Sequence, residues 1–167
     1  LRANRPTVFA GAHRFLFVND FITARLTHEH VMNPSDATMT QLFNISSGTW
    51  DEGLLAATAI RRENLSPVQP SGTPVARLNP EASADLGLPA DVLVVNGAHD
   101  QYCAAVATGA TGPGKMLLSG GTAWVLLVVP RDLQRGLDSG MAISCHAVPG
   151  RWGAIRSLGG VATSFEW

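Results

Sequence analysis

Apolar residues recur every three to four positions along two early segments of the chain. The first segment runs from Phe15 to Leu26 and the second from Leu54 to Ile60. This spacing predicts two helices, each with one buried face. Asp51 and Glu52 fall in the first turn of the second helix, where the helix dipole favours negative charge, so we expect a structural role for them.

Between these two helices lies a short polar segment, Ser35-Asp36-Ala37-Thr38, ahead of apolar residues at Met39, Leu42 and Phe43. Ser and Asp side chains in such a place accept hydrogen bonds from the free amides that begin a helix. A polar loop before a short strand is the alternative interpretation. We favour the helix cap.

Beyond residue 64, short apolar runs alternate with turn residues, a pattern typical of strands. Strands are expected over 75–78, 92–95, 116–119, 123–129, 142–147 and 152–156. Helices are expected over 80–86 and 101–108, and Gly159-Gly160 is expected to open a last helix.

The region from 64 to 89 is rich in Pro, Ser and Gly, which indicates a connection rather than a core element. The composition then changes, and an apolar, β-branched run begins at Val92. We therefore predict a domain boundary here, with part of one domain over residues 1–91 and part of a second over residues 92–167.

The two ends of the sequence are unusual for a natural chain. Leu1 is not an initiating Met, and the residues after it lack the charged-then-apolar order of a signal peptide. The last residues, 161–167, stop within a helix-like pattern that has no C-cap glycine. We expect truncation at both ends.

Composition narrows the classes of partner. The 167 residues are 46% hydrophobic and 15% charged, with a formal net charge of −1 and no long basic run, which argues against nucleic acid or a membrane surface and favours a small neutral substrate. The best apolar stretch, 123–130, is too short to span a membrane, so a soluble protein is expected.

Two cysteines, Cys103 and Cys145, fit ordinary buried thiols in a reducing cytoplasm. The oligomeric state is left open, a homodimer included.

Asp100 is the candidate for chemistry. It follows the run 92–95 through a short turn and comes just before a helix, the place where open α/β sheets carry reactive groups. We expect that strand to be buried. A carboxylate here can accept the proton of a substrate hydroxyl that attacks a phosphoryl group. The alternative is an N-cap aspartate that serves the helix alone.

Gly120-Gly121-Thr122 also allows two interpretations. Its amides and hydroxyl can cradle phosphate oxygens. The alternative is an ordinary hairpin turn between two strands, where glycine is used for its conformation.

Other chemistries fit the sequence less well. The segment from Gly109 to Met116 resembles a phosphate-binding P-loop and contains the only lysine, Lys115, but the expected helix precedes it and no Ser or Thr follows the lysine. His99, Cys103 and the pair Cys145-His146 match no zinc-ligand spacing, so we expect no metal site and interpret Cys103 as a core thiol. A Gly-x-Ser-x-Gly nucleophile elbow is absent from the sequence.

In their order along the chain, several segments resemble the FGGY carbohydrate kinases. Those segments are Phe21 to Thr27, Ser35 to Thr38, Leu42 to Leu55, Pro70-Ser71-Gly72, Val94 to Gln101, Ser119 to Thr122 and Gly159 to Trp167. His28 and Ala162 stand where the family usually has glycine. His99 beside Asp100 is similar to the His-Asp pair of some deoxysugar kinases.

The resemblance implies an α/β, ribonuclease H-like (actin-type ATPase) fold, of which this chain would hold the end of the first domain and the start of the second. It implies ATP and Mg²⁺ as cofactors and a sugar or polyol as substrate. It also implies Asp100 as catalytic base and substrate contact, Gln101 as a further substrate contact, and Gly121 and Thr122 as ATP-phosphate ligands.

The leading hypothesis from the sequence is therefore ATP-dependent phosphorylation of a sugar or polyol hydroxyl. The family's Gly-x-Asp-x-Gly-Thr phosphate loop is not in the 167 residues, so we expect the chain to be inactive alone. The alternative hypothesis is a non-catalytic sugar-binding or interaction module derived from a kinase.

Overall fold

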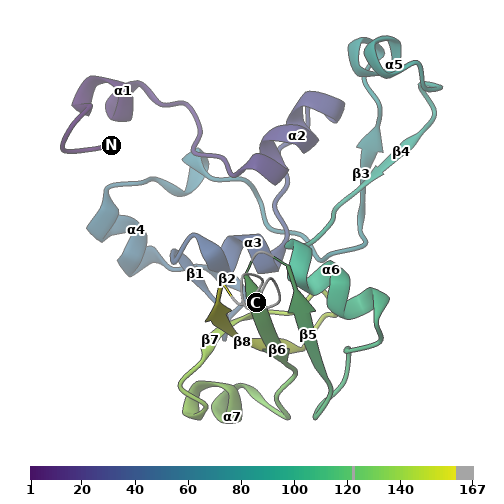
Figure 1. Ribbon diagram of the computed structural model, residues 1–167. Helices are drawn as coiled ribbons and strands as arrows, with labels where there is room; N and C mark the ends of the chain where they lie inside the picture. The colour runs from purple at the N-terminus through teal and green to yellow at the C-terminus, as the bar shows by residue number, and fades with distance from the viewer. Residues whose placement is uncertain (122, 161–167) are drawn as a thin grey trace.

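A computed structural model describes residues 1–121 and 123–160 of the chain (Figure 1). The helices are α1 (Pro6–Gly11), α2 (Val18–Thr27), α3 (Pro34–Met39), α4 (Glu52–Thr58), the 3₁₀ turn η1 (Arg62–Asn64), α5 (Pro80–Leu86), α6 (Asp100–Ala107) and α7 (Leu133–Asp138). The strands are β1 (Phe43–Asn44), β2 (Thr49–Trp50), β3 (Pro74–Arg77), β4 (Leu93–Val95), β5 (Met116–Gly120), β6 (Trp124–Val128), β7 (Ala142–Cys145) and β8 (Trp152–Gly159).

The first half of the chain packs around a small apolar core. Its buried members come from α3, the β1–β2 pair, α4 and the segments that flank them: Met32, Ala37, Phe43, Trp50, Leu55 and Leu65. The rings of Phe43 and Trp50 meet edge to face with centroids 5.6 Å apart. Trp50 also donates its indole N–H to the Ser66 carbonyl at 3.2 Å, so this buried polar atom is satisfied.

The second half is built on a four-stranded antiparallel sheet with the strand order β5-β6-β8-β7. Helix α6 packs against β5. Tyr102 and Ala105 of α6 are fully buried together with Ala110, Leu127 and Val129, and we call these five residues the Tyr102 cluster. The Tyr102 hydroxyl donates to the Gly153 carbonyl in β8 at 3.2 Å, which fixes α6 on the sheet.

Between the two halves, β3 and β4 form an antiparallel pair that carries α5 at its far end (Figure 1). The expectation of a buried strand before Asp100 is wrong. β4 pairs with β3 alone within the described residues, and Leu93 and Val95 are about half exposed because no layer covers that face. The pair also crosses the boundary placed at residue 91, which stays a prediction.

Most of the expected elements are present, with shifted ends. The hairpin of β5 and β6 follows the expected strands, α5 has the expected bounds, and Asp51 caps α4 by accepting the Leu54 amide at 3.0 Å. Ser35 to Thr38 lie inside α3, whose N-cap is Asn33. The cap position predicted from the sequence is therefore two residues too late. Gly159 is the last residue of β8, and the helix expected after Gly159-Gly160 falls on residues 161–167, which lie outside the described part.

Two six-residue helices, α1 and α7, were not predicted. Neither is long enough to show the apolar periodicity by which a helix is recognised in a sequence. None of the helices in the described part of the chain is long and apolar enough to cross a membrane.

Candidate functional site

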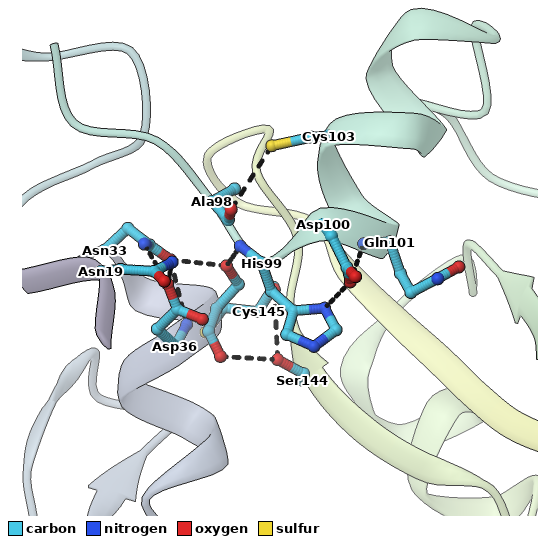
Figure 2. Close-up of polar contacts among 11 residues, drawn as sticks. Asn19, Asn33, Asp36, Ala98, His99, Asp100, Gln101, Cys103, Ser144 and Cys145 are labelled. Atoms are coloured by element: carbon cyan, nitrogen blue, oxygen red, sulfur yellow. Dashed lines mark hydrogen bonds and ion pairs between the residues drawn. The ribbon is translucent and has the colours of Figure 1, made fainter. Parts of the chain in front are cut away.

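Asp100 is the first residue of α6, and its side chain is 81% exposed. The helix begins with His99 as its N-cap residue, so the alternative interpretation of Asp100 as the N-cap is wrong. The carboxylate instead accepts the amide of Gln101 at 2.6 Å and lies 3.1 Å from His99 Nδ1 (Figure 2). The result is a solvent-facing carboxylate whose polar contacts, within the described residues, are its two neighbours in the chain.

His99 connects this carboxylate to the rest of the fold. Its carbonyl accepts the amides of Tyr102 at 2.9 Å and Cys103 at 3.1 Å, which starts the helix. Its imidazole meets the Tyr102 ring edge to face, with centroids 6.1 Å apart. Its own amide points the other way and donates to Ser35 Oγ at 2.9 Å. His99 therefore contacts both halves of the chain.

Ser35 belongs to a hydrogen-bonded group that we call the α3 polar cluster. It consists of the buried residues Asn33, Ser35 and Asp36 at the start of α3 and the exposed Asn19 of α2; Figure 2 labels Asn19, Asn33 and Asp36. Asn33 Oδ1 accepts the Asp36 amide at 3.0 Å and the Ser35 hydroxyl at 2.5 Å. Asp36 Oδ2 accepts the Nδ2 groups of Asn33 at 2.6 Å and of Asn19 at 2.5 Å. The sequence indicated capping chemistry here but not the link to His99.

Strand β7 contacts the same helix. Ser144 Oγ donates to the Ser35 carbonyl, and the Cys145 amide donates to Thr38 Oγ1, both at 3.4 Å. Burial raises the pKa of the Cys145 thiol above its ordinary value, so Cys145 is a neutral thiol at physiological pH. Helix α3 thus joins α2, the turn before α6 and the four-stranded sheet.

The predicted substrate contact Gln101 follows Asp100, but its side chain extends away from the Asp100 carboxylate (Figure 2). Gln101 Oε1 is buried and accepts no hydrogen bond within the described residues. A buried acceptor that lacks a hydrogen bond lowers the stability of the fold. Its role in substrate binding stays a prediction.

Gly121 lies in the exposed turn between β5 and β6, as the hairpin pattern predicts. Among the described residues, a Cβ built there would meet only the Ala123 carbonyl, at 3.8 Å, so that part of the chain leaves room beside the backbone. The other predicted phosphate ligand, Thr122, lies outside the described residues. The phosphate-binding role of both residues stays a prediction.

The segment from Gly109 to Met116, which resembles a P-loop in sequence, follows helix α6 and leads into strand β5. This is the order of elements that the sequence predicted. Lys115 Nζ donates to the Gly109 carbonyl at 3.0 Å and so closes the loop on itself. The prediction that Lys115 does not belong to a P-loop is confirmed, because a P-loop requires a strand before it and a helix after it.

The residues considered as metal ligands have other contacts. Cys103 is exposed, so its interpretation as a core thiol is wrong; its position on α6 turns Sγ toward the Ala98 carbonyl, 3.4 Å away. His146 is buried, its Nε2 lies 3.2 Å from the Ala110 carbonyl, and its Nδ1 accepts the Val148 amide at 3.0 Å. Among the described residues, no three His, Cys, Asp or Glu side chains are grouped to hold a metal ion.

A cavity of about 410 Å³ opens beside the turn that precedes α6. Asn96 and Ala98 line it from the turn, and Ser71 lines it from the Pro-Ser-Gly segment. Asn96 is buried and donates to the Gln69 carbonyl at 2.8 Å, which ties the two segments together. Ser71 Oγ is buried and makes no hydrogen bond within the described residues.

Known proteins share both the sequence and this arrangement. The sequence model of the N-terminal domain of the FGGY family of carbohydrate kinases matches residues 1–107, which is more than half of the chain. The autoinducer-2 kinase of an Enterobacter species is 27% identical over 90% of this chain and 28% of its own length. The L-fuculokinase of Salmonella typhi is 34% identical over 77% of this chain and 27% of its own length. The xylulose kinase of Rhodospirillum rubrum superposes on 99% of this chain and 34% of its own with a TM-score of 0.89, at 27% identity.

The chain belongs to the FGGY family of carbohydrate kinases, and its fold is the α/β, ribonuclease H-like fold of that family. The resemblance inferred from the order of short motifs is confirmed. The chain spans about a third of the length of the relatives it matches.

Proposed function

We propose that this chain is part of an ATP-dependent kinase that phosphorylates a hydroxyl of a sugar or polyol, with Asp100 as the general base. The observation that carries the proposal is the exposed Asp100 carboxylate at the start of α6, which accepts the Gln101 amide and lies 3.1 Å from His99 Nδ1. Membership of a family of carbohydrate kinases supports the reaction class.

In the proposed reaction, the Asp100 carboxylate takes the proton of the substrate hydroxyl. The hydroxyl oxygen forms a bond to the γ-phosphorus of ATP, the bond from that phosphorus to the bridging oxygen breaks, and ADP leaves. Placement of the carboxylate matters more here than a high basicity, because phosphoryl transfer depends mainly on positioning and electrostatic stabilisation. Mg²⁺, when bound with ATP, would neutralise charge on the phosphates.

Two further roles, substrate orientation and phosphate binding, complete the proposal. Gln101, whose Oε1 is buried without a partner within the described residues, would orient the substrate. Gly121, in an exposed turn with room beside it, and Thr122 would donate to the ATP phosphates. Residues 1–91 would belong to the sugar-binding domain and 92–167 to the ATP-binding domain, and the chain by itself would be inactive.

The substrate is proposed as a neutral sugar or polyol without a further assignment. The relatives carry the names of kinases for autoinducer-2, L-fuculose and xylulose, which differ in the molecule they act on.

The test is ATP consumption by the full-length protein with a panel of pentoses, hexoses, deoxysugars and polyols. We expect turnover on at least one substrate and a loss of at least about 100-fold in Asp100→Asn, which keeps the shape of the side chain but removes the base. Asp132→Asn is the matched control, because Asp132 is also an exposed carboxylate at a helix start, where it accepts the Arg135 amide at 2.8 Å. Turnover that survives in Asp100→Asn would reject the assignment. Sugar binding without turnover in the unaltered protein would favour a non-catalytic binding module.

A further inference from the structure

One hydrogen bond joins the backbone beside Asp100 to a residue 64 positions earlier in the chain. The donor is the His99 amide and the acceptor is Ser35 Oγ, 2.9 Å away. Ser35 is fully buried, so water does not compete for this contact. Because an amide can only donate, the hydroxyl accepts here, and its single proton is left for the contact with Asn33 Oδ1 at 2.5 Å.

The rest of the α3 polar cluster fixes that hydroxyl in place. Asn33 Oδ1 also accepts the Asp36 amide, so the Nδ2 group of Asn33 is directed at the Asp36 carboxylate. Asn19 of α2 donates to the same carboxylate oxygen from a second direction. Asn33 and Asp36 are 2% and 4% exposed, and hydrogen bonds between buried polar side chains rigidify the residues that make them.

Asp100 has no comparable support of its own. Its carboxylate makes its polar contacts, within the described residues, to the Gln101 amide and to His99 Nδ1, which move with the same stretch of backbone. The position of the carboxylate therefore follows the position of residues 99–101. Tyr102 holds the following helical turn on the sheet, and the Ser35 contact holds the side that precedes Asp100.

We propose that Ser35 is a positioning residue, which places the Asp100 carboxylate by holding the His99 amide. This proposal rests on the proposed function of Asp100. Ser35 touches no substrate; it acts through the backbone of His99. Phosphoryl transfer is sensitive to such placement, since a displacement of about 1 Å from a distant change can cost about 100-fold in rate.

The experiment compares Ser35→Ala with Ser66→Ala in the full-length protein. Both serines are fully buried, and each donates its hydroxyl proton to a buried side-chain acceptor, Ser66 to Asp20 Oδ2 at 2.6 Å. Ser66 has no contact with residues 99–101 among the described hydrogen bonds. The contact from Ser144 to the Ser35 carbonyl uses the main chain and remains available in the alanine variant.

We expect Ser35→Ala to lower kcat by about 10- to 100-fold while the KM for ATP changes little, and Ser66→Ala to keep the kcat of the unaltered protein. Hydrogen–deuterium exchange of the peptide that contains His99 should speed up in Ser35→Ala and not in Ser66→Ala. An unchanged kcat in Ser35→Ala, equal losses of kcat in both variants, or unchanged exchange at His99 would each overturn the proposal.

A double variant separates positioning from a loss of stability. If Ser35 acts through Asp100, adding Ser35→Ala to Asp100→Asn should lower the residual rate by less than it lowers the rate of the unaltered protein, because the two residues act as a unit. Where that residual rate is too low to measure, the exchange comparison decides. Failure of the proposed function would differ, since the unaltered protein would lack turnover or would keep it without Asp100.

Discussion

The α3 polar cluster and the Tyr102 cluster both contact the start of α6, and they hold it by different means. The first uses hydrogen bonds among four polar side chains and reaches the His99 amide through Ser35. The second buries Tyr102 against apolar side chains of the sheet, with one hydrogen bond to Gly153. Apolar burial is large and non-directional, whereas hydrogen bonds contribute less but fix direction. We therefore expect stability to depend mainly on Tyr102 and the placement of Asp100 mainly on Ser35.

The largest effect should come from removing the Tyr102 ring. Tyr102→Ala deletes a fully buried aromatic side chain, and we expect the free energy of unfolding to fall by about 3–5 kcal/mol. Tyr102→Phe keeps the ring and loses the polar contacts of the hydroxyl, to Gly153 and Ser144, for a loss of about 1 kcal/mol. Urea denaturation measures both. Similar losses in the two variants would contradict a role for the ring in packing.

A second test adds an atom at the contact between Tyr102 and Gly153 instead of removing the ring. A Cβ at Gly153 would lie within 3 Å of three atoms of the Tyr102 ring and hydroxyl, so the ring must move. We expect Gly153→Ala to reduce the free energy of unfolding by about 1–3 kcal/mol. Gly112→Ala is the control, since nothing lies within 4 Å of its added methyl group and its φ is not positive. Equal denaturation midpoints for the two variants would show that Tyr102 adapts at no cost.

A third test concerns the α3 polar cluster and compares two asparagines that cap helices. Asn33 caps α3 and Asn79 caps α5; each accepts the amide three residues on, and both are buried. Replacing either by Ala should reduce the free energy of unfolding by about 1–2 kcal/mol. Only Asn33→Ala should also lower kcat, because only Asn33 holds the Ser35 hydroxyl. The same activity loss in Asn79→Ala would assign the effect to general destabilisation.

The smallest expected effect is a dependence of the free energy of unfolding on pH, which arises from a histidine beside the Tyr102 cluster. Burial lowers the pKa of His146, which packs edge to face on Tyr102 with centroids 5.2 Å apart. Because the unfolded state then binds the proton more tightly, the stability contributed by neutral His146 is present above the ordinary pKa of 6.5 and is lost as the pH falls through the lower, folded-state value. Denaturation at a series of pH values below 7 should show this loss. His146→Asn, which cannot titrate, should reduce the slope.

The elements that could be predicted from the sequence are those with local signals. Asn79 and Pro80 mark the start of α5, and the glycines after Ser119 mark the turn between β5 and β6. Asp51 at the start of α4 was also assigned correctly as structural. In each case the residues that determine the element lie within a few positions of it.

The remaining features depend on contacts between distant segments, which no local pattern contains. The exposure of Cys103 and of β4 follows from which layers cover them, and the sequence pattern could not report that. The link from Ser35 to His99 joins residues 64 positions apart, so the sequence predicted a helix cap or a polar loop for this segment but not the link. The position of Asp100 before a helix was predictable, but the way its backbone is held was not.

The long separation between Ser35 and His99 also sets an order of events during synthesis. Helix α3 and its polar side chains leave the ribosome well before His99 does, so the acceptor exists before its donor. Closing a loop of this length costs entropy, which must be met by packing of the intervening chain. We therefore expect the segment around Asp100 to adopt its final arrangement late in folding, after each half has formed its own core.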